Sequence, residues 1–553
     1  MFDYLIQNVQ ILDGSGNSSF SGSVALDGGK IAAIGALPAG EAAHVIDGGD
    51  RFLTPGFLDI HRHADAALFR PDFGRTELRQ GLTTIVNGNC GLSLTPVSGP
   101  HREAVLEYLA PIVGQMEEPF PTLADYRRRA KEAPLPLNAG MLVGMGTLRA
   151  CTAGFRDGPL TEIEYRQIHA ALEGALADGA LGVSLGLGYA PECFYTTEEL
   201  IRALAPLRRS GRVITIHMRQ EGDGVVEALK ETLTVARALE TPVEISHLKA
   251  MGPRNWRKAV PQMLQMLTDA REAGLDIACD TYPYPAGSTQ LLHVLPPEFQ
   301  AGGVEALTAA LRDPGSRRQM RRRMETGTDF ENIVSLVGFE NIHAISLRLP
   351  EHAKFEGRTL ADIAKRQGKD PYDALFDLLA AERCGPAMID FFAHQADVED
   401  ILRSPFSGVI SDATYPQGLP HPRVYGAFPR LLETYVGHRS VLTLEKAVHK
   451  LTRQAAERFG LPQKGRIEVG ADADLCLFAP ENIHEAATWQ NPRQPAEGMD
   501  WVFVNGVPAI RDILADMEGI MARSTAVEPE QWERRSWMRK LLEKVLRVFS
   551  IWM

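Results

Sequence analysis

His61 and His63 stand one residue apart at the end of an apolar run that begins at Phe57. Alternate side chains of a strand point to the same face, so both imidazoles would face one way and Arg62 the other. Two imidazoles held on a rigid element make half of a metal site. With 15 histidines in 553 residues, such a pair arises by chance roughly 0.4 times, so its meaning depends on what lies downstream.

Four more residues with suitable chemistry follow later β-rich runs. Cys90 lies in Asn89-Cys90-Gly91, His217 and His247 end two further runs, and Asp412 ends the last one. In a barrel of parallel strands, the carboxyl ends of the strands meet on the face that carries the active site. Sulfur together with imidazole favours zinc. The pattern therefore predicts a zinc centre with a carboxylate beside it.

Such a set of residues is typical of hydrolases. Zinc with nitrogen and sulfur ligands and an open position lowers the pKa of bound water to about 7. A neighbouring carboxylate, here Asp412, can take a proton from the attacking water and pass it to the leaving group. This chemistry cleaves amides, esters and related bonds.

The middle of the chain alternates short β-rich runs with longer amphipathic stretches. Alternation of this kind predicts a parallel sheet, and eight units indicate a closed (β/α)8 barrel of the α/β class. An open doubly wound sheet is the alternative, but no Gly-x-Gly-x-x-Gly follows the first strand. The expected strands cover residues 57–61, 83–87, 139–144, 181–187, 213–218, 243–248, 276–282 and 408–412.

Both ends of the chain carry short β patterns that are too small to bury a core alone. We therefore expect one small β-sandwich made from both ends, a lid inserted after the seventh strand, and a helical tail that docks on the body or on a partner. The expected domains are 1–56 with 461–506 for the sandwich, 57–460 for the barrel, 286–345 for the lid and 507–553 for the tail.

The composition excludes several classes of protein. A net charge of -12 argues against general affinity for nucleic acid or for anionic membranes. No secretory signal or transmembrane stretch is evident, and the six cysteines lack the spacing of a disulfide framework. We expect a cytoplasmic protein that acts on a small molecule, without stable membrane association, and a homo-oligomer stays open.

The motifs resemble those of the D-aminoacylase (N-acyl-D-amino-acid deacylase) family of the amidohydrolase superfamily, from about residue 3 to residue 506. The matching segments are Gly88-Asn89-Cys90-Gly91, His217-Met218-Arg219, Ser246-His247-Leu248-Lys249, Tyr282-Pro283-Tyr284, Ala286-Gly287-Ser288-Thr289, Ser411-Asp412 and His421-Pro422-Arg423.

The resemblance implies roles for individual residues. Cys90, His217 and His247 would hold the tighter zinc, and a cysteine would take the place of the bridging lysine of many amidohydrolases. His61 and His63 would help to form a second, weaker site, and Asp412 would be the general base and acid. The implied substrate-binding residues are Lys249, Tyr282, Ser288 and Arg423.

The implied reaction is zinc-dependent hydrolysis of N-acyl-D-amino acids to a carboxylate and a D-amino acid. A hydrolase of a cyclic amide, a urea or a dipeptide is the alternative, and a barrel used only as a scaffold is a remote one. One departure concerns Met145, which stands where the family would have a histidine facing the site. Side-chain preference, acyl preference and the number of working metals stay open.

Overall fold

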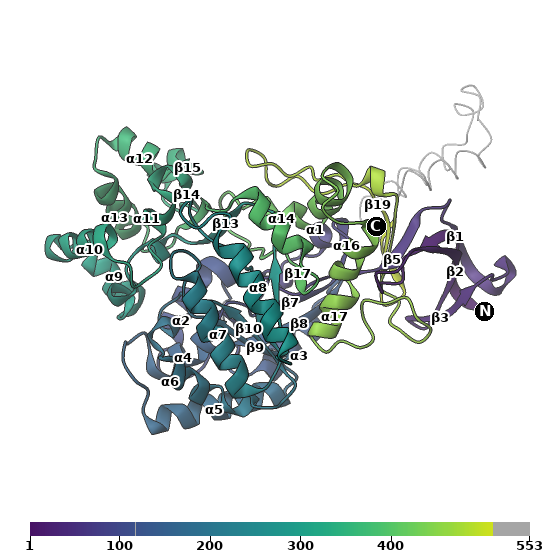
Figure 1. The fold of residues 1–553 in the computed structure, drawn as a ribbon, viewed down its shortest axis with the longest axis horizontal. Helices are drawn as coiled ribbons and strands as arrows, with labels where there is room; N and C mark the ends of the chain where they lie inside the picture. Colours follow the sequence, from purple (N-terminus) through teal and green to yellow (C-terminus); the bar gives the residue numbers. More distant parts are fainter. Residues whose placement is uncertain (117, 512–553) are drawn as a thin grey trace, which may run out of the picture. The chain divides into compact units, whose positions relative to one another are not determined.

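The computed structural model describes residues 1–116 and 118–511 (Figure 1). The predicted tail therefore falls almost entirely outside the described residues. The compact unit described below ends at Ile510. Within the described chain, every helix is too short or too polar to cross a membrane.

The central sheet has eight parallel strands in the order β17-β12-β11-β10-β9-β8-β7-β6, which confirms the predicted barrel. β-Branched and aliphatic residues dominate these strands, as in Val213-Ile214-Thr215-Ile216 of β10, and they are buried on both faces. The strands are β6 (Phe57–Asp59), β7 (Leu82–Asn87), β8 (Asn138–Gly144), β9 (Gly182–Gly186), β10 (Val213–His217), β11 (Val243–Ile245), β12 (Ile277–Thr281) and β17 (Ser407–Val409).

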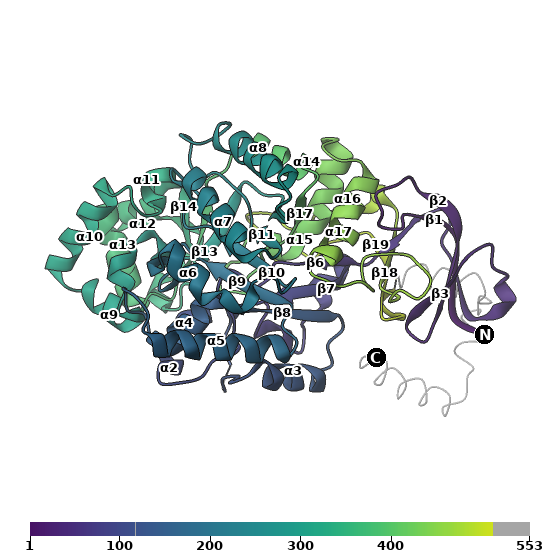
Figure 2. The ribbon, with the colours of Figure 1, turned by 60° about the horizontal axis from the view of Figure 1, so that its bottom comes forward.

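Helices follow the strands and pack on the outside of the sheet, as α5 to α8 do in Figure 2. Local signals set their ends, and a capping box between Thr161 and Glu164 starts α5. The helices of the barrel are α1 (Arg75–Arg79), α2 (Arg102–Val113), α3 (Leu123–Glu132), α4 (Met145–Ala153), α5 (Glu162–Ala177), α6 (Thr197–Ala203), α7 (Val225–Leu239), α8 (Ala259–Glu272), α14 (Gln395–Arg403), α15 (Arg423–Arg430), α16 (Leu444–Leu451) and α17 (Arg453–Arg458).

The barrel closes just beyond the ends of β6 and β17. The backbone N–H of Asp412 donates to the carbonyl of His61 over 2.9 Å, and the N–H of His63 donates to the carbonyl of Ala413 over 2.9 Å. These bonds join the first strand to the last. They bring Asp412 beside the histidine pair, although about 350 residues separate them in the chain.

Arg62 points away from the two histidines and is completely buried, as the alternation of the strand predicts. Its guanidinium lies 2.9 Å from an oxygen of Asp59 and 2.7 Å from an oxygen of Glu77. It also donates to Ser411 and to the hydroxyl of Tyr415. This network ties the first strand to the last behind the histidines.

The two ends of the chain share one eight-stranded sheet with its own hydrophobic core. Antiparallel pairing of β18 with β5 joins the ends. This agrees with a small β-domain built from both termini, although its exact limits stay a prediction. The strands are β1 (Phe2–Ile11), β2 (Phe20–Asp27), β3 (Lys30–Gly35), β4 (Ala42–Asp47), β5 (Phe52–Pro55), β18 (Leu475–Phe478), β19 (Met499–Val504) and β20 (Val507–Arg511).

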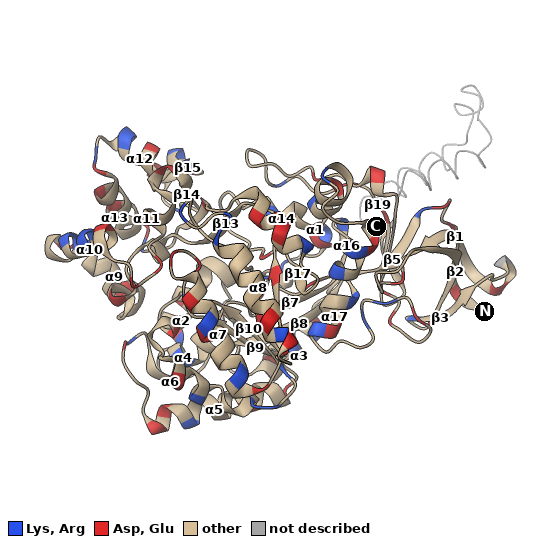
Figure 3. Ribbon diagram, viewed as in Figure 1, with Lys and Arg blue, Asp and Glu red and all other residues tan. Residues whose placement is uncertain are grey.

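The segment between β12 and α14 carries a four-stranded sheet and five helices, and it continues well past residue 345, the end that the sequence analysis gave to the lid. Figure 3 shows a basic run on one of its helices, α10. The elements are β13 (Ala286–Gln290), α9 (Gly303–Ala310), α10 (Pro314–Thr326), α11 (Ile333–Val337), β14 (Ile342–Ile345), β15 (Arg358–Thr359), α12 (Leu360–Gln367), α13 (Pro371–Ala381) and β16 (Ala387–Phe391).

We predict that Arg62→Met strongly lowers the free energy of unfolding, because it leaves the Asp59 and Glu77 carboxylates buried without their cation. Removing one partner of a buried ion pair costs about 3–5 kcal/mol. Lys230→Met is the control, since Lys230 pairs with Glu227 on the surface and should cost less than about 1 kcal/mol. Urea unfolding followed by circular dichroism measures both, and equal losses would contradict the prediction.

Candidate metal centre and active site

Three candidate residues leave their strands in a left-handed backbone conformation. The φ angles are +54° at Cys90, +37° at His247 and +50° at Asp412. Such angles are uncommon for residues other than glycine and cost of order 1–3 kcal/mol each. They persist where the surrounding structure enforces them, which is typical of functional sites. Here each one follows a barrel strand at the end where the site lies.

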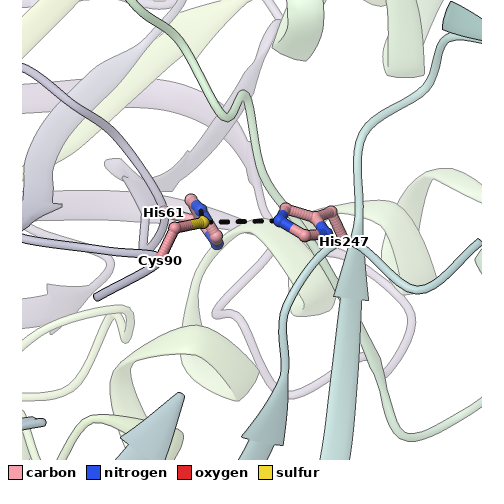
Figure 4. Close-up of side chains that lie close together, drawn as sticks. All are labelled: His61, Cys90 and His247. Atoms are coloured by element: carbon pink, nitrogen blue, oxygen red, sulfur yellow. Dashed lines mark hydrogen bonds between the residues drawn. The ribbon is translucent and has the colours of Figure 1, made fainter. Parts of the chain in front are cut away.

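The sulfur of Cys90 lies among imidazole nitrogens (Figure 4). It is 3.2 Å from Nε2 of His61 and 3.4 Å from Nε2 of His247. The latter nitrogen is in turn 3.1 Å from Nδ1 of His217. A tetrahedral zinc with bonds of roughly 2.0–2.3 Å separates its ligand atoms by about 3.3–3.8 Å. The separations of 3.1–3.4 Å lie close to the lower end of this range, and the donor types fit zinc.

Asp412 joins the other side of this group. One of its oxygens, Oδ1, lies 3.5 Å from Nε2 of His61 and 3.3 Å from Nε2 of His63. Three groups of described residues could hold an ion: His61, His63 and Asp412; His61, Cys90 and His247; and His217, Glu221 and His247. The first two share His61, and the last two share His247. Cys90 thus lies between the histidines that the resemblance assigns to two different sites.

Burial keeps His61 and His217 neutral, which is the form in which an imidazole ligates a metal. Removal from water lowers the pKa of His61 to about 3 and that of His217 well below its usual value. Burial raises the pKa of the Cys90 thiol, and nearby carboxylates, Asp412 first among them, raise it further. A bound cation reverses this effect, because it stabilises the thiolate.

Arg423 lies behind Asp412. Its guanidinium is 2.9 Å from Oδ2 of Asp412 and donates to the carbonyl of Ser288. Burial raises the pKa of Asp412, but Arg423 and the site histidines outweigh it and hold that pKa well below its ordinary value. The Asp412 carboxylate is therefore ionised at neutral pH.

A cavity opens over the histidines. Lys249, Tyr282, Ser288 and Asp412 line it together with His217 and His247. The structure therefore brings three of the four predicted substrate-binding residues together in the cavity wall. The fourth, Arg423, is completely buried and is not among the described lining residues. The guanidinium of Arg423 stacks over the ring of Tyr282 at 4.7 Å.

Three buried carboxylates near the cavity escaped the sequence analysis. Glu221 lies 3.0 Å from Nδ1 of His247, Asp280 accepts the backbone N–H of that histidine, and Asp390 lines the cavity. The signals for the first two were a carboxylate four residues after His217 and a charged residue inside an apolar strand. Asp390 comes from β16 of the four-stranded sheet and carries no comparable signal.

Met145 does not face the cavity as the resemblance implied. It is the first residue of α4, is completely buried and packs in the main hydrophobic core. The described lining of the cavity does not include it. The reason is that its thioether is apolar and gains more from packing in the core than from a polar site.

Comparison with known proteins identifies the family. The Amidohydrolase family model matches residues 44–510. A D-aminoacylase of Alcaligenes xylosoxydans xylosoxydans is 34% identical over 92% of this chain and 94% of its own length, and an N-acyl-D-aspartate deacylase of the same organism is 32% identical over 91% of both.

A solved structure gives the same result. The N-acyl-D-glutamate deacylase of Bordetella bronchiseptica, in complex with zinc and a phosphonate inhibitor that mimics the tetrahedral intermediate, aligns with a TM-score of 0.79. It is 31% identical, and the alignment covers 92% of this chain and 96% of that one. With its barrel, its cluster of histidines and cysteine, and these relatives, the chain belongs to the D-aminoacylase (N-acyl-D-amino-acid deacylase) family of amidohydrolases.

Proposed function

We propose that this protein hydrolyses the amide bond of N-acyl-D-amino acids in a zinc-dependent reaction and releases a carboxylate and a D-amino acid. The observation that carries the proposal is the buried meeting of a thiol, four imidazoles and an ionised carboxylate at the edge of one cavity. Membership of the deacylase family supports the substrate class and the choice of the D enantiomer.

The fit of the donor atoms supports a zinc centre. Cys90, His217 and His247 would hold the tighter ion, and Nε2 of His247 lies 3.4 Å from the Cys90 sulfur and 3.1 Å from Nδ1 of His217. His61 and His63, which cluster with Asp412, would contribute to a second, weaker site. When bound there, zinc supplies an acidic water with a pKa of about 7 and polarises the amide carbonyl.

Asp412 is the residue that moves the proton. Because its carboxylate is ionised, it can accept a proton from the attacking water through Oδ1, which faces His61 and His63. The same group then donates that proton to the nitrogen of the leaving amine. Arg423 holds the other oxygen, Oδ2, and so fixes the orientation of the carboxylate.

Lys249, Tyr282 and Ser288 are suited to hold the substrate carboxylate. All three line the cavity, and the ammonium of Lys249 carries the positive charge that a buried carboxylate needs. Its Nζ bonds to Glu221 over 2.6 Å, which fixes the ammonium beside His247. Arg423 contributes to this region through Tyr282 and Asp412.

We predict that zinc-loaded protein releases primary amine from N-acetyl-D-amino acids and much more slowly from the L forms. Asp412→Asn should lower kcat by about 10²–10⁴-fold, because proton transfer by a side chain contributes a factor of that size. Amine release measures both. If no member of the panel is cleaved while zinc is bound, the proposal fails and cyclic amides and dipeptides become the substrates to test.

The walls of the cavity support a preference for uncharged amino-acid side chains. In the described lining, Lys249 and Arg219 are the only lysine and arginine. The guanidinium of Arg219 is already bonded to Glu231 and to two backbone carbonyls. His293 lacks a charge, since burial lowers its pKa to about 3. With Lys249 assigned to the substrate α-carboxylate, a side-chain carboxylate would find no further unpaired cation in the described lining.

We predict that kcat/KM for N-acetyl-D-methionine and N-acetyl-D-leucine exceeds that for the D-aspartate and D-glutamate derivatives by about 100-fold, because a buried carboxylate without a cation is costly. Phe330→Lys places a cation on the wall of the cavity and should reduce this difference. Initial rates with matched N-acetyl substrates measure it. Equal values for D-leucine and D-glutamate would contradict the preference.

Arg423→Ala should move the acidic limb of the pH profile of kcat/KM to higher pH. Without the guanidinium, the pKa of Asp412 rises, so the base is lost at a higher pH as the solution is made more acidic. If Arg423 instead serves mainly as an anchor for the substrate carboxylate, KM rises and the limb stays in place. A series of rates across pH separates the two roles.

We further propose a cytoplasmic location. All six cysteines are free, which suits a reducing compartment.

A further inference from the structure

We propose that Glu221 is a positioning residue that holds His247 and His217 in the orientation and protonation form that bind the metal. The proposal rests on the zinc centre of the proposed function. Glu221 lies beside the predicted ligands but belongs to none of the motifs that carry the family resemblance. Its carboxylate is almost completely buried and faces both histidines.

The two ring nitrogens of His247 face different partners. Its Nε2 faces the sulfur of Cys90 and Nδ1 of His217, so this nitrogen is the one that meets a metal. Its Nδ1 faces Oε1 of Glu221 at 3.0 Å. A neutral imidazole that ligates through Nε2 must carry its proton on Nδ1, and that N–H needs an acceptor. Glu221 is placed to accept it.

His217 shows the same arrangement with its nitrogens reversed. Nδ1 faces His247 and the cluster, while Nε2 lies 3.8 Å from Oε2 of Glu221. This Nε2 atom is buried and makes no hydrogen bond. The two oxygens of one carboxylate therefore face the outward nitrogens of two ligand histidines. Oε1 lies within hydrogen-bond distance of His247, and Oε2 faces His217 at a longer distance.

Lys249 is the reason why His247 needs Glu221 as an acceptor for its Nδ1 proton. Its Nζ lies 2.6 Å from Nδ1 of His247 and 2.6 Å from Oε1 of Glu221. An ammonium can only donate, so a bond from Lys249 to Nδ1 would force the His247 proton onto Nε2, the nitrogen that the metal needs. Glu221 offers Lys249 another acceptor and accepts the Nδ1 proton as well. It thus allows a cation for the substrate to sit beside a metal ligand.

The backbone around Glu221 holds it in this place. Its N–H donates to a carboxyl oxygen of Glu331 over 2.5 Å, and its carbonyl accepts the N–H of Met251 over 2.8 Å. Its Oε1 also pairs with the ammonium of Lys249 at 2.6 Å. The group is an anion fixed from both sides, as a positioning carboxylate should be.

The test is metal affinity, measured by competition with a chelator on the full chain, together with the visible spectrum of the cobalt-substituted protein. Loss of a residue that orients a ligand weakens metal binding by about 10–100-fold. We expect that loss for Glu221→Gln, with altered cobalt bands. Glu331→Gln is the control, since this half-buried carboxyl lines the same cavity and its replacement keeps an oxygen that can accept the backbone N–H of Glu221.

A double variant distinguishes positioning from a merely structural role. In the Glu221→Gln background, Lys249→Met removes the ammonium that competes for Nδ1 and should restore a large part of the affinity. Unchanged affinity in Glu221→Gln, or no recovery in the double variant, would overturn the proposal. If the unaltered protein itself binds zinc no more tightly than Cys90→Ser does, the proposed zinc centre fails instead.

Discussion

The joining of the first barrel strand to the last is the constraint on which the site depends. The bonds from Asp412 to His61 and from His63 to Ala413 close the sheet and also place the carboxylate against the histidines. A shift of register by one residue would turn the histidines outward and bring Arg62 inside, because the side chains alternate. The buried contacts of Arg62 with Asp59 and Glu77 oppose such a shift. Closure and catalysis therefore use the same backbone bonds.

The fold holds the site at considerable cost. Cys90, His247 and Asp412 each have a strained backbone, and several charged groups lie out of water beside them. Each strained residue costs of order 1–3 kcal/mol, and an unpaired buried charge costs more. The compensation is local pairing: Arg423 with Asp412, Lys249 with Glu221, and Arg62 with its two carboxylates. These pairs keep each side chain in one orientation, which a metal ligand or a base requires.

The sequence predicts the barrel well because each strand is marked locally by a short β-rich run. The eight expected runs all appear as strands, and Cys90, His217, His247 and Asp412 meet as expected at their carboxyl ends. What it predicts poorly depends on contacts between distant segments. The contact of Arg423 with Asp412 has no signal in the chain, and the role of Arg423 as a substrate anchor stays a prediction. Met145 reads as a residue of the site, yet it packs in the core. The proposed role of Glu221 follows only from the orientation of two histidine rings, which the sequence does not give.

The low pKa of Asp412 limits what this carboxylate can do by itself. A carboxylate with so low a pKa is a weak base, and by itself it could not take a proton from ordinary water. It can do so only beside a group that makes the water acidic, and its Oδ1 faces the histidine pair while Oδ2 is bonded to Arg423. Without Arg423, the Asp412 carboxylate would be a stronger base. It would then be protonated at neutral pH, since burial raises the pKa of a carboxyl group. Arg423 thus makes Asp412 a weaker base but keeps it ionised at neutral pH. The cluster of sulfur and imidazole beside Asp412 compensates, because a metal held there would make the water more acidic.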